Sequence, residues 1–158
     1  MNYECKNLCA VISGGTSGIG LAVAEKLLLD GARVYIIGRS LERGTNAVKY
    51  LQKKTGQTAV FLPCDVAKAE SCQKAVAGIK MHQLDDNILQ ARVDILVNSA
   101  GIYREQRLEE MQESDYQKIF DTNVKGTMLL TQAILPLMQG EGSIVNVSSD
   151  AGISGNYG

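Results

Sequence analysis

Five short apolar runs recur along the chain, and each one ends at a turn-forming or polar residue. Several of the runs are rich in β-branched residues, which is typical of strands that are buried on both faces of a parallel sheet. The pattern therefore predicts five strands, which cover residues 8–12, 34–37, 59–62, 93–97 and 143–147.

Two of the segments between these strands have clear helix boundaries. Residues 18–30 carry an apolar stripe and are followed by Gly31, a residue type well suited to the position just after a helix. Residues 40–54 open with Ser40 as an N-cap and close at Gly56. Both segments are predicted to be helices.

Two further segments are predicted to be helical with less regular ends. Residues 67–90 are helical in part, with a helix end and a loop expected within 81–90. A capping box, Ser114-Asp115-Tyr116-Gln117, is expected to open a long apolar helix over residues 114–139, which Pro136 bends near its end. Strands that alternate with helices predict an α/β fold, a parallel sheet wound by right-handed crossovers.

Composition narrows the class of protein. The chain has 158 residues and a net charge of −1, and its Lys and Arg residues are scattered, so no basic patch for nucleic acid or an anionic membrane is expected. The apolar run 8–12 is too short for a signal segment or a membrane span. We expect one soluble domain over residues 1–158, located in the cytoplasm.

The cysteines do not point to a metal site. Cys5, Cys9, Cys64 and Cys72 have a spacing that fits no common zinc pattern, and His82 is the only histidine. In a chain without an export signal, four reduced and mostly buried thiols are expected, with a metal site or a disulfide as the alternative.

A glycine-rich turn follows the first predicted strand, with the spacing Gly14-x-x-x-Gly18-x-Gly20. A turn from a strand into a helix needs backbone angles that favour glycine, and the helix start then directs free N–H groups and a partial positive charge towards a pyrophosphate. Thr16 and Ser17 can add hydroxyl donors. A packing turn is the alternative, but the position between the first strand and the first helix favours a dinucleotide. A Walker loop is excluded because no Lys-Ser/Thr pair follows.

The end of the second strand indicates which dinucleotide is bound. Sites that prefer NAD usually place a carboxylate here for the ribose 2′-hydroxyl, and this chain has Arg39-Ser40 instead. Arg39 can pair with a 2′-phosphate and Ser40 can add a hydrogen bond, so NADP is favoured over NAD. A solvated surface arginine is the alternative, and Ser17 counts mildly against NADP because NADP sites often have a basic residue within the turn.

Together with four other segments, this turn resembles the short-chain dehydrogenase/reductase family, in the branch that includes bacterial 3-oxoacyl-carrier-protein reductases. The resemblance covers the whole chain. It rests on Ser13-Gly14-Gly15-Thr16-Ser17-Gly18-Ile19-Gly20, Cys64-Asp65-Val66, Asp94-Ile95-Leu96-Val97-Asn98-Ser99-Ala100-Gly101, Asn123-Val124-Lys125-Gly126 and Gly142-Ser143-Ile144-Val145-Asn146-Val147-Ser148-Ser149.

The resemblance implies a Rossmann-like, doubly wound sheet with the strand order 3-2-1-4-5. It implies an NADP-dependent oxidoreductase that transfers hydride between the nicotinamide and a carbonyl or alcohol substrate, with a small molecule or an acyl-carrier-bound 3-oxoacyl thioester as the first guess. It also implies a homodimer or homotetramer at full length. A non-redox sensor or an assembly partner with this fold is a weaker alternative, because fold alone does not determine function.

The resemblance also assigns site residues, and Asn123 and Ser149 are the catalytic ones. In the family this asparagine distorts its helix and helps hold a water molecule in a proton relay, and the serine hydrogen-bonds the substrate carbonyl oxygen. Local alternatives are a helix cap for Asp65 and turn roles for Asn98 and Ser149. The predicted cofactor contacts are Gly14, Thr16, Ser17, Gly18, Ile19, Gly20, Arg39, Ser40, Asp65, Val66, Asn98, Ala100 and Gly101.

The family's chemistry also requires a tyrosine, about a dozen residues after the serine, and a lysine four positions later. Counted from Ser149, both fall beyond Gly158. Tyr157 is too close to Ser149 and is predicted to be a loop residue. We therefore expect these residues to be the N-terminal part of a longer chain, with an inactive dinucleotide-binding fragment or pseudoenzyme as the alternative.

Overall fold

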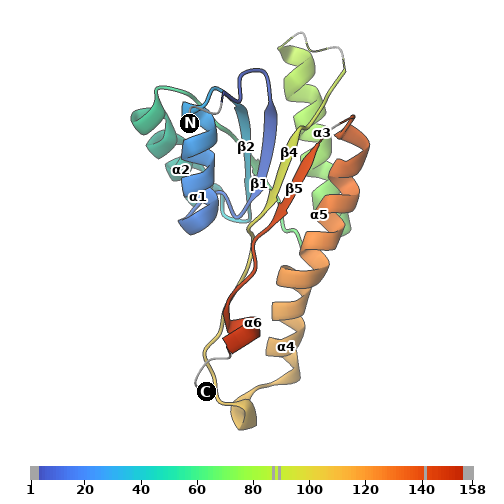
Figure 1. Ribbon diagram of the computed structural model, residues 1–158. Helices are drawn as coiled ribbons and strands as arrows, with labels where there is room; N and C mark the ends of the chain where they lie inside the picture. Colours follow the sequence, from blue (N-terminus) through green and yellow to red (C-terminus); the bar gives the residue numbers. More distant parts are fainter. Residues whose placement is uncertain (1–3, 87, 89, 141, 155–158) are drawn as a thin grey trace.

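A computed structural model describes residues 4–86, 88, 90–140 and 142–154. Its centre is a parallel sheet of five strands in the order β3-β2-β1-β4-β5 (Figure 1). This order and the α/β class confirm the prediction. The strands are β1 (Cys9–Ser13), β2 (Arg33–Gly38), β3 (Val60–Pro63), β4 (Ile95–Asn98) and β5 (Ser143–Asn146).

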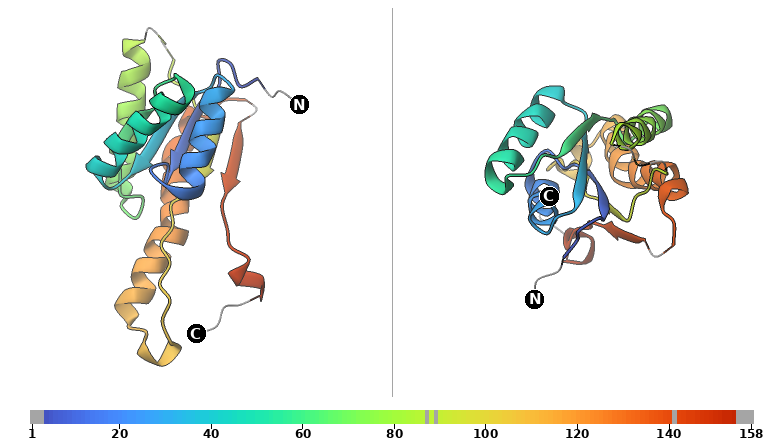
Figure 2. Two further views of the ribbon diagram at one scale, coloured as in Figure 1. Left: turned by 90° about the vertical axis from the view of Figure 1, so that its left-hand side faces the viewer. Right: turned by 90° about the horizontal axis from the view of Figure 1, so that it is seen from above.

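Helices cover both faces of the sheet, as Figure 2 shows in two further views. α1 (Gly18–Leu29) and α2 (Leu41–Thr55) lie on one face, and α3 (Ala69–Asp85) and α5 (Gly126–Ile134) lie on the other. None of the helices in the described ranges is long and apolar enough to cross a membrane.

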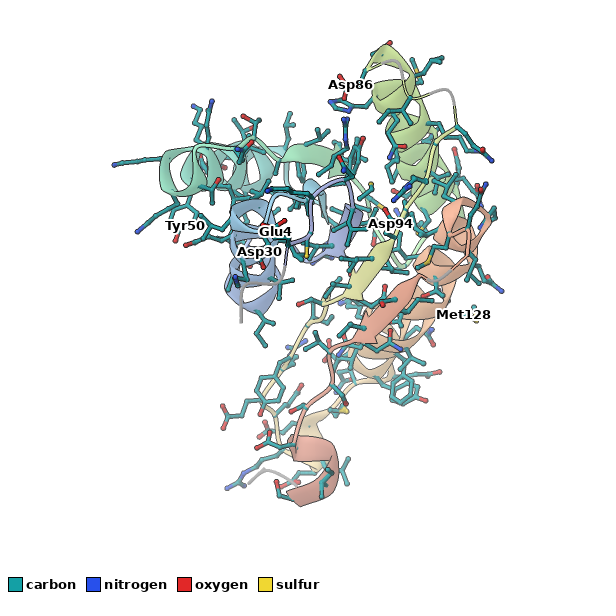
Figure 3. The ribbon with its side chains drawn as sticks, turned by 45° about the horizontal axis from the view of Figure 1, so that its top comes forward. Glu4, Asp30, Tyr50, Asp86, Asp94 and Met128 are labelled. Atoms are coloured by element: carbon teal, nitrogen blue, oxygen red, sulfur yellow. The ribbon has the colours of Figure 1, made fainter. Side chains whose placement is uncertain are left out.

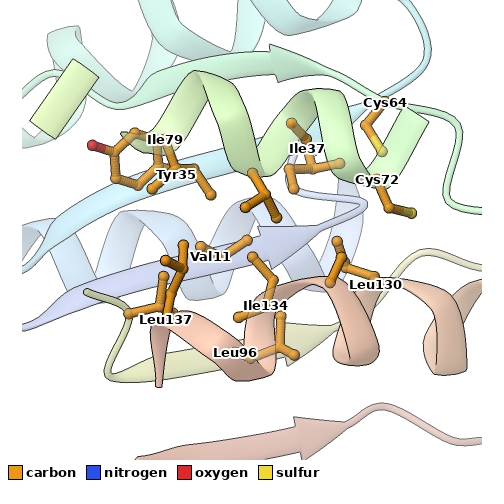
Figure 4. Packing of buried hydrophobic residues seen from close by; sticks show 14 of the residues in the cluster. Val11, Tyr35, Ile37, Cys64, Cys72, Ile79, Leu96, Leu130, Ile134 and Leu137 are labelled. Atoms are coloured by element: carbon orange, nitrogen blue, oxygen red, sulfur yellow. The ribbon is translucent and has the colours of Figure 1, made fainter. Parts of the chain in front are cut away.

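Side chains of the central strands alternate between two apolar cores, because successive residues of a strand point to opposite faces. On β1, Val11 packs in the core under α3 and α5, together with Leu130 and Ile134 (Figure 4). Its neighbour Ile12 packs in the core under α1 and α2, together with Leu28. The predicted run 8–12 is therefore apolar throughout because helices cover both faces of β1.

The helix boundaries predicted at Ser40, Gly56 and Gly31 are confirmed. Ser40 precedes α2, and its Oγ accepts a hydrogen bond from the Arg43 N–H at 3.2 Å. Gly56 follows α2 with a φ of 70°, and Gly31 follows α1 with a φ of 87°. These are left-handed conformations that glycine adopts without steric cost.

The predicted capping box at Ser114 is wrong. Helix α4 (Glu113–Phe120) begins one residue earlier, and its N-cap is Gln112. A capping box needs the Gln117 side chain to reach back to the N-cap, but its Nε2 donates forward to Asp121 Oδ1 at 2.8 Å. Gln117 thus bonds to a residue of the following turn and not to the backbone at the helix start, so the sequence pattern does not form a capping box here.

The predicted irregular stretch 81–90 is helical in its first half, because α3 continues to Asp85. Gln83 anchors this part of the helix: its Nε2 donates to Arg92 O and its Oε1 accepts from the Arg92 N–H, both at 2.9 Å. His82 adds a hydrogen bond to the Tyr35 hydroxyl at 3.1 Å. The hydrogen-bond partners of Gln83 and His82 lie outside α3. Without knowledge of these partners, the two polar residues only interrupt the apolar pattern of the helix.

The predicted long helix is a continuous helical run with a changed pitch at its centre. α4 is followed by a π-helical turn, η2 (Asp121–Lys125), then by α5 and by the 3-10 turn η3 (Leu135–Leu137), which contains Pro136. α4 projects beyond the sheet beside the loop that leaves β4, where the 3-10 turn η1 (Leu108–Glu110) lies (Figure 1).

Strand β5 lies at one edge of the sheet. It pairs with β4 in parallel, and all four of its residues are exposed. The outward face of α5 is exposed too: Met128 points away from the sheet and is 50% exposed (Figure 3). The short helix α6 (Ala151–Ser154) follows β5.

Candidate functional site

A cavity of about 180 Å³ opens at the carboxyl ends of β1 to β4, where ligands of doubly wound sheets are expected to bind. Most of the predicted cofactor contacts line it, namely Gly14, Thr16, Ser17, Arg39, Ser40, Asp65, Val66, Ala100 and Gly101. Residues that were not among the predicted cofactor contacts also line it, namely Ile37, Gly38, Arg43, Cys64, Ile102 and Thr122.

Gly14 lets the turn after β1 pass close to the end of β4. Its φ is 67°, and a Cβ atom added here would lie 2.8 Å from the carbonyl oxygen of Ser99. Its N–H donates to Ile37 O at 2.9 Å, which ties the turn to β2. Only glycine fits this position, for reasons of both conformation and space.

The other two glycines of the motif shape the start of α1. A Cβ at Gly20 would lie 2.6 Å from Gly14 O, so the helix start can pack directly on the turn. Gly18 has a φ of 53° and no atoms within 4 Å of its added Cβ, so it is needed for its conformation. Ile19 points outwards and is 61% exposed. Neither Gly18, Ile19 nor Gly20 lines the cavity.

The N-terminus of α1 faces the cavity with Ser17 as its N-cap. The Ser17 side chain makes no capping hydrogen bond, so the N–H groups of the first turn keep free donors. Together with the Thr16 and Ser17 hydroxyls at the cavity wall, they form a donor set that suits an anionic oxygen.

Ser13 connects the turn to the strand that follows on its other side. Its Oγ accepts hydrogen bonds from the backbone N–H groups of Ser99 and Ala100, each at 3.1 Å. Ser13 is itself buried at the end of β1. The Ser13 hydroxyl therefore holds the residues that follow β4 against the glycine turn. In this way it positions Ala100, which lines the cavity.

Two arginines lie at the end of β2, where the sequence analysis predicted one. The capping bond between Ser40 and the Arg43 N–H places Arg43 in the first turn of α2, beside Arg39. Both guanidinium groups are exposed, and neither forms an ion pair with a carboxylate of the described part of the chain. The N-cap Ser40 could place Arg43 in the first turn of a helix from sequence alone, but not on the side that faces the cavity.

Asp65 lies in the turn between β3 and α3, and the alternative of a helix cap is wrong, because the N-cap of α3 is Lys68. Its Oδ1 accepts a hydrogen bond from the Ala67 N–H at 3.2 Å, which is a local turn role. Its Oδ2 lies 3.9 Å from Lys68 Nζ, and the residue lines the cavity. The Asp65 N–H donates to the Ser71 hydroxyl at 2.9 Å, so the whole turn into α3 is fixed.

Asn98 lies at the end of β4 and is 4% exposed. Its Nδ2 donates to Thr131 Oγ1 at 3.0 Å and to Asn146 Oδ1 at 2.9 Å, which joins β4 to α5 and β5. Its Oδ1 is buried without a protein partner. Asn98 does not line the cavity, so its side chain can act on a cofactor only through the position of the β4 end.

The two predicted catalytic residues lie outside the cavity lining. Asn123 sits in η2, so the predicted helix distortion at this residue is present. Ser149 is exposed, and its Oγ accepts from the Ala151 N–H at 3.2 Å, which is the local turn role considered for it. Tyr157 and Gly158 lie outside the described residues.

The cavity fits a nicotinamide dinucleotide at its adenosine and pyrophosphate end. Gly14, whose turn packs closely on the exit of β4, lines the cavity beside the free N–H groups of α1, and such a close backbone approach suits a pyrophosphate. Arg39 and Arg43 supply the charged, multidentate donors that a further phosphate requires. Asp65 supplies an acceptor for an amino group.

Three known proteins that are similar to this chain support this fit. The 3-oxoacyl-[acyl-carrier-protein] reductase FabG of Aquifex aeolicus is 37% identical over 160 residues, which cover 100% of this chain and 62% of that protein. A 3-oxoacyl-[acyl-carrier-protein] reductase of Bos taurus is 39% identical over 153 residues, which cover 96% of this chain and 60% of that protein. A short chain dehydrogenase of Shigella flexneri 2a, solved in complex with NADP, has a TM-score of 0.85 at 25% identity and is matched over 99% of this chain and 64% of its own.

The chain spans 54% to 62% of the length of the curated relatives that it matches first. The family model described as short chain dehydrogenase matches residues 8–158. The match includes the glycine turn, the end of β4 and the π-helical turn, which the structure brings to one end of the sheet. The chain therefore belongs to the short chain dehydrogenase family.

Proposed function

We propose that this chain carries the cofactor-binding part of an NADP-dependent oxidoreductase, which transfers hydride between the nicotinamide and a carbonyl or alcohol substrate. The observation that carries the proposal is that the glycine turn at Gly14 and the two arginines, Arg39 and Arg43, line one cavity. Membership of the family supports oxidoreductase chemistry. The NADP in the Shigella flexneri structure supports the choice of cofactor.

Each part of the cavity is assigned to one part of NADP. The N–H groups at the start of α1 and the Thr16 and Ser17 hydroxyls hold the pyrophosphate. Arg39, Arg43 and Ser40 hold the 2′-phosphate. The loop after β4 and the turn after β3 complete the binding site, with Asp65 and Val66 at the adenine and Ala100 and Gly101 on the opposite wall.

Catalysis is assigned to Asn123 and Ser149 together with a tyrosine and a lysine from a segment beyond residue 158. The bound nicotinamide supplies or accepts the hydride. The Ser149 hydroxyl donates a hydrogen bond to the substrate carbonyl oxygen, and Asn123 keeps the loop beside the cavity in place. The 3-oxoacyl thioesters reduced by the named relatives are the first substrates to test, in a single-domain homodimer or homotetramer of the cytoplasm.

Cofactor preference can be tested by titrating the full chain with NADPH and with NADH, using nucleotide fluorescence. Arg39→Ala should weaken NADPH binding roughly tenfold, as expected when a charged hydrogen bond is lost, and leave NADH binding nearly unchanged. Lys49→Ala, which removes an exposed charge of α2 outside the cavity, is the matched control. Equal losses for both nucleotides in Arg39→Ala would contradict the assignment to a 2′-phosphate.

The second candidate is a dinucleotide-binding protein without turnover. It is favoured by one observation: the Ser149 hydroxyl accepts a hydrogen bond from the Ala151 N–H, and Ser149 does not line the cavity. The test adds a 3-oxoacyl thioester to the full chain, including the proposed segment beyond residue 158, and measures NADPH consumption. Consumption that falls at least about a hundredfold in Ser149→Ala would support the reductase. Binding without consumption would support this second candidate, and no binding of either nucleotide would leave a sensor or assembly role.

A further inference from the structure

Arg39 and Arg43 reach the cavity from one short stretch of chain, between the end of β2 and the first turn of α2. Both side chains are exposed, and within the ranges that the structure describes neither guanidinium group is paired with a carboxylate. Two positive charges on one cavity disfavour each other, and an anion between them relieves this. Because no ion pair fixes the two arginines, their positions depend on where the backbone of residues 38–44 is held.

A glycine bounds this stretch at each end, and both glycines lie against the ring of Phe61 on β3. A Cβ atom added at Gly44 would lie 2.4 Å from the Cδ1, Cε1 and Cζ atoms of the ring. A Cβ atom added at Gly38 would lie 3.7 Å from its Cε2 atom. The ring therefore supports both the end of β2 and the start of α2.

Gly44 is needed for space and not for its conformation. It is a buried residue of α2, and its backbone is not left-handed. Glycine is less favourable than alanine inside a helix, so a glycine at this position needs another reason. The contact with Phe61 supplies that reason, because any side chain at Gly44 would push the first turn of α2 away from the ring.

Two hydrogen bonds connect Gly44 to Arg43 through the N-cap. The Gly44 N–H donates to Ser40 O at 2.9 Å, and Ser40 Oγ accepts from the Arg43 N–H at 3.2 Å. The other end of the stretch is held by the sheet, where Gly38 O accepts from the Cys64 N–H at 2.9 Å. A displacement of Gly44 would therefore move the turn that carries Arg43, while the end of β2 stays in place.

Neither partner of this contact touches the cavity. Gly44 and Phe61 are both absent from its lining, and Phe61 packs against the core under α1 and α2. They can therefore affect a bound cofactor only by the position that they give to their neighbours, and Arg43 is the neighbour that lines the cavity.

We propose that Gly44 and Phe61 are positioning residues for the 2′-phosphate: their contact holds Arg43 at the cavity and so sets the preference for NADPH over NADH. This inference rests on the proposed function, because the 2′-phosphate is what distinguishes the two nucleotides. The pyrophosphate is assigned to a different helix, α1. A displaced start of α2 should therefore weaken mainly the nucleotide that carries the 2′-phosphate.

The first test is Gly44→Ala in the full chain, titrated with NADPH and with NADH by nucleotide fluorescence. The new methyl group would overlap the Phe61 ring, so α2 must move outwards. We expect NADPH to bind at least about fivefold more weakly and NADH to bind with nearly unchanged affinity. Asn46→Ala is the matched control, because it adds an alanine to the same helix at an exposed position outside the cavity. It should leave both affinities unchanged.

Two double variants show whether the effect passes through the proposed contact. Phe61→Val removes the three ring atoms that the methyl group meets, so Gly44→Ala in this background should keep NADPH affinity within about twofold of Phe61→Val alone. In an Arg43→Ala background, Gly44→Ala should cause no further loss, because the residue that it positions is gone. The unfolding temperature is a readout without nucleotide: Gly44→Ala and Phe61→Val together should lower it by less than the sum of their separate effects.

A Gly44→Ala chain that keeps its preference for NADPH would overturn the inference, because the ring would then turn aside without moving Arg43. Equal losses of NADPH and NADH binding would overturn it too, since they indicate a general loss of structure. A wild-type chain that binds neither nucleotide is a different result, because it contradicts the proposed function and with it the effect on selectivity. The unfolding temperatures would still decide whether Gly44 and Phe61 are coupled.

Discussion

Both ends of the Asn123 carboxamide bond to the backbone of Ile102. Oδ1 accepts from the Ile102 N–H at 2.8 Å, and Nδ2 donates to Ile102 O at 2.9 Å. Gly101 lies against the same carboxamide, because its added Cβ would be 3.6 Å from Oδ1. The π-helical turn that carries Asn123 is thus joined directly to the loop that forms one wall of the cavity.

Asn123→Ala removes both of these hydrogen bonds. Since the site is exposed, we expect the free energy of unfolding to fall by about 1 kcal/mol, at the low end for two bonds. Amide hydrogen exchange at Ile102 should become faster. Urea unfolding and exchange mass spectrometry check these outcomes. Asn123→Asp keeps the acceptor but not the donor and should give an intermediate result; unchanged exchange at Ile102 in Asn123→Ala would show that the loop is held by other contacts.

Gly20→Ala places a methyl group 2.6 Å from Gly14 O, a backbone atom that cannot turn aside. We expect a loss of about 1–3 kcal/mol in the free energy of unfolding and weaker NADPH binding, because the helix start must move away from the turn. Thermal unfolding and NADPH titration measure the two effects. Gly152→Ala is the control, since its added Cβ meets no atom within 4 Å. A Gly20→Ala chain as stable as this control would refute the close packing.

Ser13→Ala leaves the backbone N–H groups of Ser99 and Ala100 without their acceptor. A loss of about 1–3 kcal/mol is expected from the unsatisfied donors, together with weaker NADPH binding as the β4 end loosens. Ser13→Thr keeps the hydroxyl and should retain most of the stability. Urea unfolding of the three chains tests this, and equal effects of alanine and threonine would indicate that packing at Ser13 matters rather than its hydroxyl.

The thiols should differ in how their alkylation depends on pH. The pKa of Cys64 is lowered by the Cys72 thiol, so its thiolate is present at a lower pH than that of an ordinary cysteine. The pKa of Cys9 is raised to about 12, so in the folded chain it stays protonated, and unlabelled by iodoacetamide, up to about pH 9. Peptide mass spectrometry across a pH series identifies the labelled residues. Labelling of Cys9 before Cys64 in the folded chain would reverse the expected order.

The elements that could be predicted correctly are those whose information is local. Ser40 and Gly56 bound α2 as expected, because a cap depends on bonds within one turn of the chain. The same reasoning failed at Ser114. There the carboxylate of Asp115 is buried and paired with Arg104, and Gln117 bonds within the next turn, so contacts invisible to a four-residue pattern decided where α4 begins.

The candidate site was predictable where a motif residue itself lies at the cavity. Gly14, Arg39 and Asp65 line it as expected. Arg43 was missed because the sequence does not show which face of the first turn of α2 lies over the cavity. Asn98 occupies a motif position that predicts a cofactor contact, yet its side chain donates hydrogen bonds to Thr131 and Asn146. These two residues are distant in sequence and lie next to Asn98 only in the folded chain.

By itself, the sequence determined that the chain alternates strands and helices, that a glycine turn starts the first helix, and that Arg39 replaces a carboxylate. These depend on short-range sterics and on the burial that apolar runs require. Only the tertiary structure decided that Ser13 holds the end of β4 and that Asn123 holds Ile102. Such pairs form where strand ends and helix starts converge, and their geometry follows from the packing of the whole sheet.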